Sequence, residues 1–110
     1  CWYKSLTPLM AEVREKLGDG PVYLSFDIDG IDPAFAPGTG TAEIGGLTST
    51  QGIEIIRGMR GLDVIGGDLV EVSPPYDPFG NTSVLAANLL FEMLCILPGV
   101  RYDDKVKAIY

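Results

Sequence analysis

An apolar stretch that ends in two carboxylates is the most informative feature of this chain. Residues 22–29 read Val-Tyr-Leu-Ser-Phe-Asp-Ile-Asp, and β-branched, aromatic and aliphatic residues of this kind favour a strand. The two-residue period of a strand places Asp27 and Asp29 on one face beside Ser25, with the apolar side chains on the other. Two carboxylates on one face of a buried strand repel each other, so they must share a proton, find cationic partners or hold a metal.

The chain alternates between helical and strand-like patterns. The expected elements are a helix over 8–17, a strand over 22–29, a helix that begins after Thr48 and ends by Gly61, a strand over 63–72 and a helix from 81–83 to 97. This order is typical of a parallel sheet with right-handed crossovers, and apolar strands of this kind are covered by helices. The residues therefore predict an α/β fold.

Local signals mark the ends of the helices and the loop between the last two elements. Thr7 before Pro8 predicts an N-cap for the first helix, and Thr48 with Gln51 matches a capping box. Asn81, Thr82 or Ser83 is expected to cap the last helix. The segment 73–80 contains three prolines, so we expect a rigid loop without regular structure.

The acids of the two strands are expected at one edge of the sheet. Asp27 and Asp29 close the first strand and Glu71 closes the second. Ligands of open α/β sheets bind beyond the carboxyl ends of the strands. Carboxylate oxygens suit Mg²⁺, Ca²⁺ and Mn²⁺. The rim is therefore a candidate cation site, although a solvated strand end with turn-forming aspartates remains an alternative.

Charge and composition limit the kinds of binding partner and compartment that suit this chain. The chain of 110 residues has a net charge of −7, which argues against nucleic acid and anionic membranes and suits a small cationic ligand. The most apolar stretch, 84–97, contains Asn88 and Glu92 and is shorter than the roughly 20 residues that span a bilayer. Two cysteines are too few for a disulfide framework, so a reducing compartment, the cytoplasm or the mitochondrial matrix, is expected.

One alternative enzyme class comes from the same strand end. The run Phe-Asp-Ile-Asp-Gly also resembles the nucleophile motif of haloacid dehalogenase phosphatases, in which Asp27 would attack phosphorus, Asp29 would act as acid and base, and Mg²⁺ would neutralise charge. That motif continues with Thr or Val and then an aliphatic residue, whereas Ile31, Asp32 and Pro33 follow here.

Several motifs together resemble the carboxyl-terminal part of the ureohydrolase family, which includes arginase, agmatinase and guanidinobutyrase. The matching segments are 25–33, 36–41, Gly46-Leu-Thr48 and Glu71-Val-Ser-Pro-Pro-Tyr-Asp77, in this order, and the sequence is most similar to agmatinase members. The resemblance implies that residues 1–110 are the carboxyl-terminal part of one domain, a three-layer αβα sandwich with a parallel sheet that is truncated at its amino terminus. The charged tail 101–110 is expected to fray.

The resemblance also implies a site and a reaction. A binuclear Mn²⁺ centre would activate water for attack on a guanidinium carbon, with Asp27 bridging both metals and Asp29 completing one. Glu71 would pair with the substrate guanidinium, and Thr41 would line the pocket. Asp32 and Asp68 are expected to be outer-shell or turn residues.

The sequence contains no histidine, whereas the family's site needs histidines, so the remaining ligands and the catalytic groups are expected upstream of Cys1. The resemblance implies hydrolysis of agmatine to putrescine and urea, with arginase or guanidinobutyrase activity as the alternatives inside the family, and a homo-oligomer. Because the histidines are missing, an inert or assembly module is a further alternative.

Overall fold

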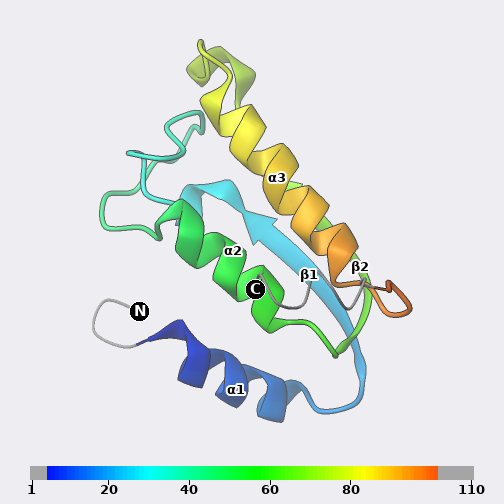
Figure 1. Ribbon diagram of the computed structural model, residues 1–110. Helices are drawn as coiled ribbons and strands as arrows, with labels where there is room; N and C mark the ends of the chain where they lie inside the picture. Colours follow the sequence, from blue (N-terminus) through cyan, green and yellow to red (C-terminus); the bar gives the residue numbers. More distant parts are fainter. Residues whose placement is uncertain (1–4, 102–110) are drawn as a thin grey trace.

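The computed structural model describes residues 5–101 of the chain, in which helices and strands alternate (Figure 1). The elements are α1 (Leu6–Leu17), β1 (Pro21–Asp27), a 3₁₀ turn (Ile28–Gly30), α2 (Ser49–Gly58), β2 (Asp63–Val70), a 3₁₀ turn (Pro74–Tyr76) and α3 (Asn81–Cys95). The expected tail over 101–110 lies outside the described residues, apart from Arg101.

The two strands form a parallel sheet, which confirms the predicted α/β class. Ser25 pairs with Asp68 and Asp27 pairs with Val70, so both strands end at the same edge. The register shifts between Val22 and Tyr23, which is the signature of a β-bulge. The two strands are therefore aligned at their carboxyl ends.

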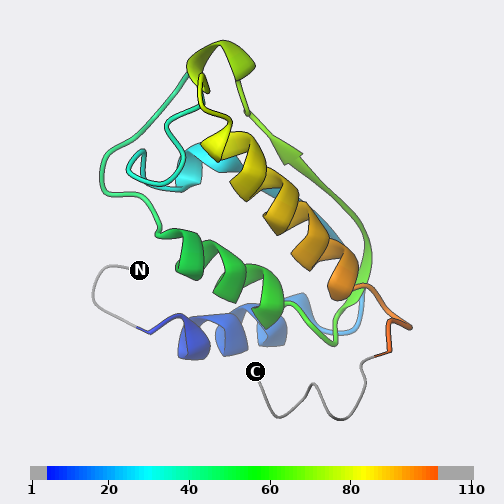
Figure 2. The same cartoon turned by 45° about the horizontal axis from the view of Figure 1, so that its top comes forward.

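The helices cover one face of the sheet within the described part of the chain. In Figure 2, α3 lies in front of β1, and contacts join α2 to α3 and α1 to α2. Along β1, Val22 and Phe26 are buried against this layer, whereas Tyr23, Ser25 and Asp27 are exposed. The second helical layer of a sandwich is not among residues 5–101.

The core lies between the sheet and the α2–α3 pair. Ile28, Ile31, Ile56 and Leu89 are fully buried there, and burial of such side chains stabilises a fold by roughly 1.5–3 kcal/mol each. Helix α2 approaches the sheet closely at Gly52, where a Cβ atom would lie 2.9 Å from Ile31 Cδ1, so a larger residue would require the Ile31 side chain to shift. The bidentate pair of Arg57 with Glu92, at 2.8 and 2.7 Å, joins α2 to α3, and these hydrogen bonds lower the pKa of Glu92.

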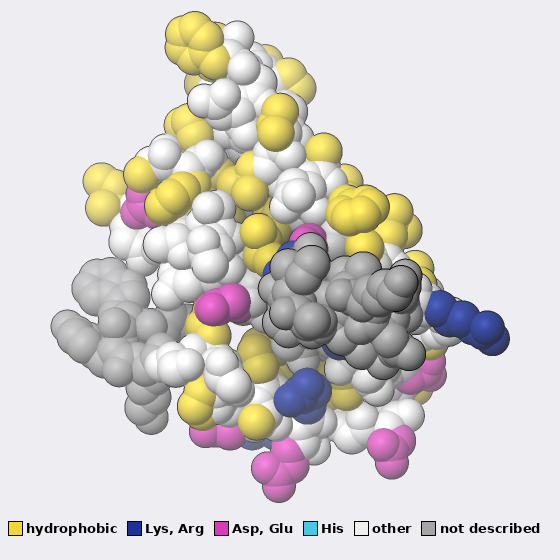
Figure 3. All heavy atoms as spheres, in the orientation of Figure 1, with side chains coloured by type: hydrophobic (Ala, Val, Ile, Leu, Met, Phe, Trp, Pro, Cys, Tyr) yellow, Lys and Arg dark blue, Asp and Glu magenta, His cyan; other side chains and the backbone are white. Residues whose placement is uncertain are grey.

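Helix α3 exposes apolar side chains as well as burying them. Val84, Leu90, Phe91 and Leu94 are exposed, and Figure 3 shows hydrophobic side chains gathered over this helix. Apolar surface of this extent is typical of a face that another polypeptide segment covers. At 15 residues, α3 is the longest described helix, and no helix within residues 5–101 is long and apolar enough to cross a membrane.

Several predicted boundaries were wrong, among them the end of α3, which lies at Cys95 rather than Leu97. Helix α1 begins at Leu6, because Ser5 rather than Thr7 is its N-cap and the Ser5 hydroxyl accepts the Thr7 N–H at 3.3 Å. Pro8 still lies in the first turn, where its missing N–H costs nothing. Strand β1 ends at Asp27 rather than Asp29, and β2 ends at Val70 rather than Val72.

The capping prediction for α2 is confirmed, whereas that for α3 is wrong. Thr48 and Gln51 exchange both hydrogen bonds of a capping box, at 2.9 and 3.1 Å. The N-cap of α3 is Gly80, which has a left-handed φ of 73° and no side chain to donate or accept.

The buried carboxylate of Asp77 provides the cap of α3 instead. It accepts the N–H of Thr82 at 3.0 Å and both the N–H and hydroxyl of Ser83 at 2.9 and 2.6 Å. These hydrogen bonds hold the pKa of Asp77 below its usual value. Within the loop 73–80, residues 74–76 form a short 3₁₀ turn rather than the irregular chain that was expected.

Candidate metal and guanidinium site

The predicted acids lie at the carboxyl edge of the sheet. Because Asp27 pairs with Val70, Glu71 follows immediately on the neighbouring strand. Asp29 lies in the 3₁₀ turn directly after β1 rather than in the strand. The turn forms because Asp27 Oδ1 accepts the backbone N–H of Asp29 at 3.1 Å. The strand period therefore explains the position of Asp27 but not that of Asp29.

Two carboxylate oxygens at this edge are free to bind a cation. Asp29 Oδ2 accepts the hydroxyl of Thr41 at 2.7 Å, and Asp27 Oδ1 accepts the Asp29 N–H. The other oxygen of each carboxylate accepts no hydrogen bond from residues 5–101. Carboxylate oxygens of this kind suit Mn²⁺ and other hard cations. The donor set thus fits part of a metal site, and no group of three potential ligands gathers within the described chain.

Glu71 has an unusual backbone conformation. Its φ of 69° is the only positive value for a non-glycine residue within the described chain. Glu71 lies directly after β2, at the carboxyl edge of the sheet, and its side chain is exposed. A left-handed conformation costs an ordinary residue about 1–2 kcal/mol, and such outliers concentrate at functional sites.

Asp32 shapes the long loop that follows the 3₁₀ turn. Its carboxylate accepts the N–H of Ala34 at 2.8 Å and of Gly45 at 2.9 Å, and these bonds to backbone N–H groups lower the pKa of Asp32. Backbone hydrogen bonds also join the two ends of this loop. The Asp32 N–H donates to the Leu47 carbonyl, and the Leu47 N–H donates to the Gly30 carbonyl, both at 2.8 Å. Of the two roles expected for Asp32, the structure shows the turn residue.

The same loop is tied to the segments around the second strand. The N–H of Gly38 donates to Thr82 Oγ1 at 2.9 Å, and the Ser73 N–H donates to the Gly38 carbonyl at 2.8 Å. Only glycine fits at position 38, since a Cβ atom would lie 2.6 Å from Asp77 Cβ. The loops that follow β1 and β2 are therefore one hydrogen-bonded assembly above the sheet.

Asp68 lies on the exposed face of the sheet and joins the strands. It accepts the hydroxyl of Ser25 at 2.6 Å and that of Tyr23 at 2.9 Å. The hydrogen bond to the Asp68 carboxylate raises the pKa of Tyr23. The roles of Tyr23 and Asp77 were not predicted from the sequence, because each finds its partners through the fold or through a loop.

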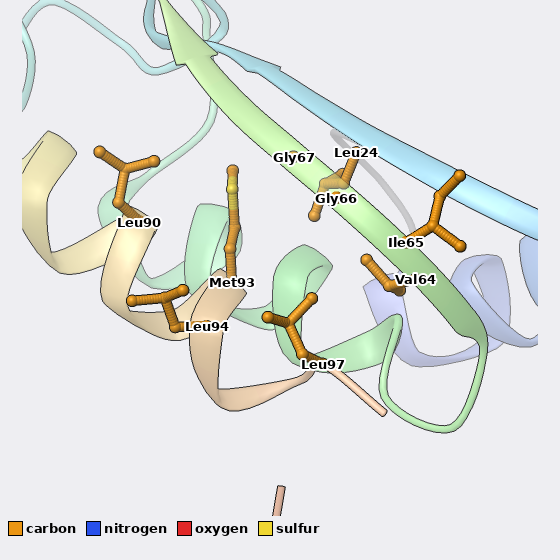
Figure 4. Close-up of a pocket in the computed structure, with 9 residues that line it drawn as sticks. All are labelled: Leu24, Val64, Ile65, Gly66, Gly67, Leu90, Met93, Leu94 and Leu97. Atoms are coloured by element: carbon orange, nitrogen blue, oxygen red, sulfur yellow. The ribbon is translucent and has the colours of Figure 1, made fainter. Parts of the chain in front are cut away.

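A cavity within residues 5–101 lies away from this rim. It has a volume of about 420 Å³ and lies between the first half of β2 and the second half of α3 (Figure 4). Its lining is apolar and consists of Leu24, Val64, Ile65, Gly66, Gly67, Leu90, Met93, Leu94 and Leu97. Without a titratable or polar side chain, it offers no chemistry for the predicted reaction.

Comparison with known proteins decides the family. A sequence model described as "Arginase family" matches residues 1–95. The chain belongs to the arginase family. This confirms the resemblance to ureohydrolases, and it removes the support for the phosphatase alternative.

Similar curated proteins include a guanidinobutyrase, an agmatinase and a guanidino acid hydrolase. The chain is 80% identical over 100 residues to a guanidinobutyrase of Pseudomonas aeruginosa, covering 91% of this chain and 31% of that protein. It is 70% identical to the mitochondrial agmatinase of Gallus gallus, covering 92% and 30%. It is also 70% identical to the mitochondrial guanidino acid hydrolase of Homo sapiens, covering 91% and 28%. The chain therefore spans about a third of the length of these relatives.

Solved structures agree on the fold of the arginase family. The proclavaminate amidino hydrolase of Streptomyces clavuligerus superposes with a TM-score of 0.79 at 47% identity, covering 82% of this chain and 31% of that one. A hypothetical agmatinase of Burkholderia thailandensis superposes with a TM-score of 0.77 at 46% identity, covering 81% and 28%. The described helices and strands are thus arranged as in longer proteins of this fold.

Proposed function

We propose that the full-length protein containing this chain is a Mn²⁺-dependent amidinohydrolase that converts a linear guanidino compound to an amine and urea. Residues 1–110 would form the carboxyl-terminal part of its single catalytic domain. The observation that carries this proposal is the shared rim of Asp27, Asp29 and Glu71 in a chain of the arginase family. The histidine ligands and the groups that transfer protons would come from the rest of the protein, because this chain contains no histidine.

Each acid has a role that follows from its chemistry. Asp27 would bind both manganese ions and Asp29 one of them, through the oxygens that accept no hydrogen bond from the described chain. Manganese, when bound, would supply a water of lowered pKa and electrophilic stabilisation of developing charge. Glu71 would accept two N–H groups of the substrate guanidinium, a charge-assisted and geometrically selective contact.

The choice of substrate lies between two kinds of guanidino compound. Agmatine, which would yield putrescine and urea, is the substrate that the sequence resemblance implies. A guanidino acid is the second candidate, because the match to the guanidinobutyrase is 80% identical and that to the mitochondrial agmatinase is 70%. Glu71 would recognise the guanidinium that both share, so residues at the other end of the substrate would discriminate between them.

The test is urea release by the full-length protein, loaded with Mn²⁺ and offered agmatine, 4-guanidinobutyrate and arginine in parallel. Asp29→Ala should abolish urea release. Asp19→Ala, which removes an exposed acid from the turn between α1 and β1, is the matched control and should retain it. Urea release that persists in Asp29→Ala, or that never occurs with any guanidino compound, would contradict the proposal. An inert module would give this last result.

We also propose a homo-oligomer in the cytoplasm or mitochondrial matrix, acting on a small cationic substrate and on neither nucleic acid nor membranes. The negative charge supports the choice of a cationic substrate, and two similar proteins are named as mitochondrial. Light scattering on the purified full-length protein would give the number of subunits, and cell fractionation would give the compartment.

A further inference from the structure

Thr41 contacts a candidate metal ligand directly. We propose that Thr41 is a positioning residue that orients the carboxylate of Asp29 for metal binding. This inference depends on the manganese site proposed above, and it goes beyond the pocket-lining role that the family resemblance implies for Thr41.

The hydrogen bond from Thr41 gives the two carboxylate oxygens of Asp29 different roles. The Thr41 hydroxyl donates to Oδ2 at 2.7 Å, a distance typical of a strong O–H···O bond. Oδ1 accepts nothing from residues 5–101 and is the oxygen left for a cation. Rotation of an aspartate carboxylate about its last torsion is broad unless contacts restrict it. Thr41 therefore limits this rotation before any metal arrives.

The position of Thr41 is set by the loop, not by its neighbours in sequence. The loop is tied on one side at Gly38, which bonds to Thr82 and to Ser73. On the other side it is tied at Gly45, whose N–H donates to Asp32. These anchors hold Thr41 against Asp29 although twelve positions separate the two residues. Thr41 is itself exposed, so its side chain contributes little to the core.

A positioning role and a substrate-reading role predict different measurements. The Thr41 hydroxyl has one proton, and that proton lies in the hydrogen bond that the hydroxyl donates to Asp29. If Thr41 orients Asp29, loss of the hydroxyl weakens metal binding. If Thr41 instead contacts the substrate, loss of its hydroxyl raises KM and leaves the affinity for Mn²⁺ unchanged.

The experiment is calorimetric titration of Mn²⁺ into the metal-free full-length protein. Thr41→Val removes the donor while keeping the shape, Thr41→Ala removes it without a branched side chain, and Thr41→Ser keeps it. Thr39→Val is the matched control, because Thr39 lies in the same loop and its buried hydroxyl has no partner within the described chain. Loss of an outer-shell partner typically costs about 10–100-fold in metal affinity.

We expect Thr41→Val and Thr41→Ala to weaken Mn²⁺ binding by about tenfold or more, with Thr41→Ser and Thr39→Val close to the wild type. At saturating Mn²⁺, KM should remain near the wild-type value. Unchanged Mn²⁺ affinity in both donor-free variants, or a raised KM with unchanged affinity, would overturn the role of Thr41.

The same titration separates this inference from the proposed activity. If Mn²⁺ binds and both donor-free variants weaken it, but no guanidino compound is hydrolysed, the positioning role holds and the proposed reaction fails. If the wild-type protein binds no Mn²⁺, the inference about Thr41 fails with the metal site itself.

Discussion

Glu71 allows a direct measurement of backbone strain at the candidate site. Its φ of 69° is left-handed, a conformation that costs a residue with a Cβ atom about 1–2 kcal/mol and costs glycine almost nothing. Glu71→Gly and Glu71→Ala both remove the carboxylate, so they differ only in this strain and in the flexibility of the unfolded chain. That flexibility disfavours glycine by about 0.5–1 kcal/mol. We therefore expect the glycine variant to be the more stable of the two, by up to about 1.5 kcal/mol.

Ser73 provides the matched reference, since its φ is −113° and its side chain makes no capping hydrogen bond. There, glycine should be less stable than alanine by about 0.5–1 kcal/mol, so the order reverses between the two positions. The difference between the two comparisons isolates the strain, about 1–2 kcal/mol. The assay is urea denaturation of the full-length protein, with midpoints compared at equal slopes. If glycine is the less stable variant at both positions, Glu71 is not strained and the argument is wrong.

Two further predictions concern the scaffold below the site. The pKa of Asp77 is lowered in the folded state, so its contribution to stability is complete above the ordinary aspartate pKa of about 3.9 and is lost as the pH falls through the lower folded-state value. Asp77→Asn should therefore flatten the acid side of the stability curve measured by urea denaturation, and an unaltered acid side would contradict this role. Leu89 is fully buried, so Leu89→Ala should destabilise the protein by about 2–5 kcal/mol, whereas Leu89→Met should cost less than about 1.5 kcal/mol. Equal midpoints for these two variants would show that Leu89 does not pack in the core.

Some signals that act between near neighbours in the chain were read correctly from the sequence, although the Ser5 cap of α1 was not. The capping box of Thr48 and Gln51 was predicted and is present, because both of its hydrogen bonds join residues three positions apart. The parallel α/β arrangement was also predicted, because apolar strands separated by a helix pair in this way. The alternation of buried Val22 and Phe26 with exposed Ser25 and Asp27 follows from the strand period.

Predictions failed where a residue's partner lay outside the expected local pattern. Asp29 was placed in a strand, but the side chain of Asp27 accepts its N–H and turns the chain. The cap of α3 was sought at residues 81–83, but it comes from Asp77 in the preceding loop. Side chains at several different sequence positions can accept the same backbone N–H, so the sequence does not show which of them does.

The sequence by itself determined which acids follow the two strands and that both strands end at one edge of the sheet, because the order of the elements along the chain sets the direction of parallel strands. Only the tertiary structure decided how those acids are held. The hydrogen bond from Thr41 to Asp29 joins residues twelve positions apart, and Ser73, two residues after the left-handed Glu71, is bonded to Gly38 of the other loop. Their geometry depends on contacts between distant segments, which no single stretch of sequence contains.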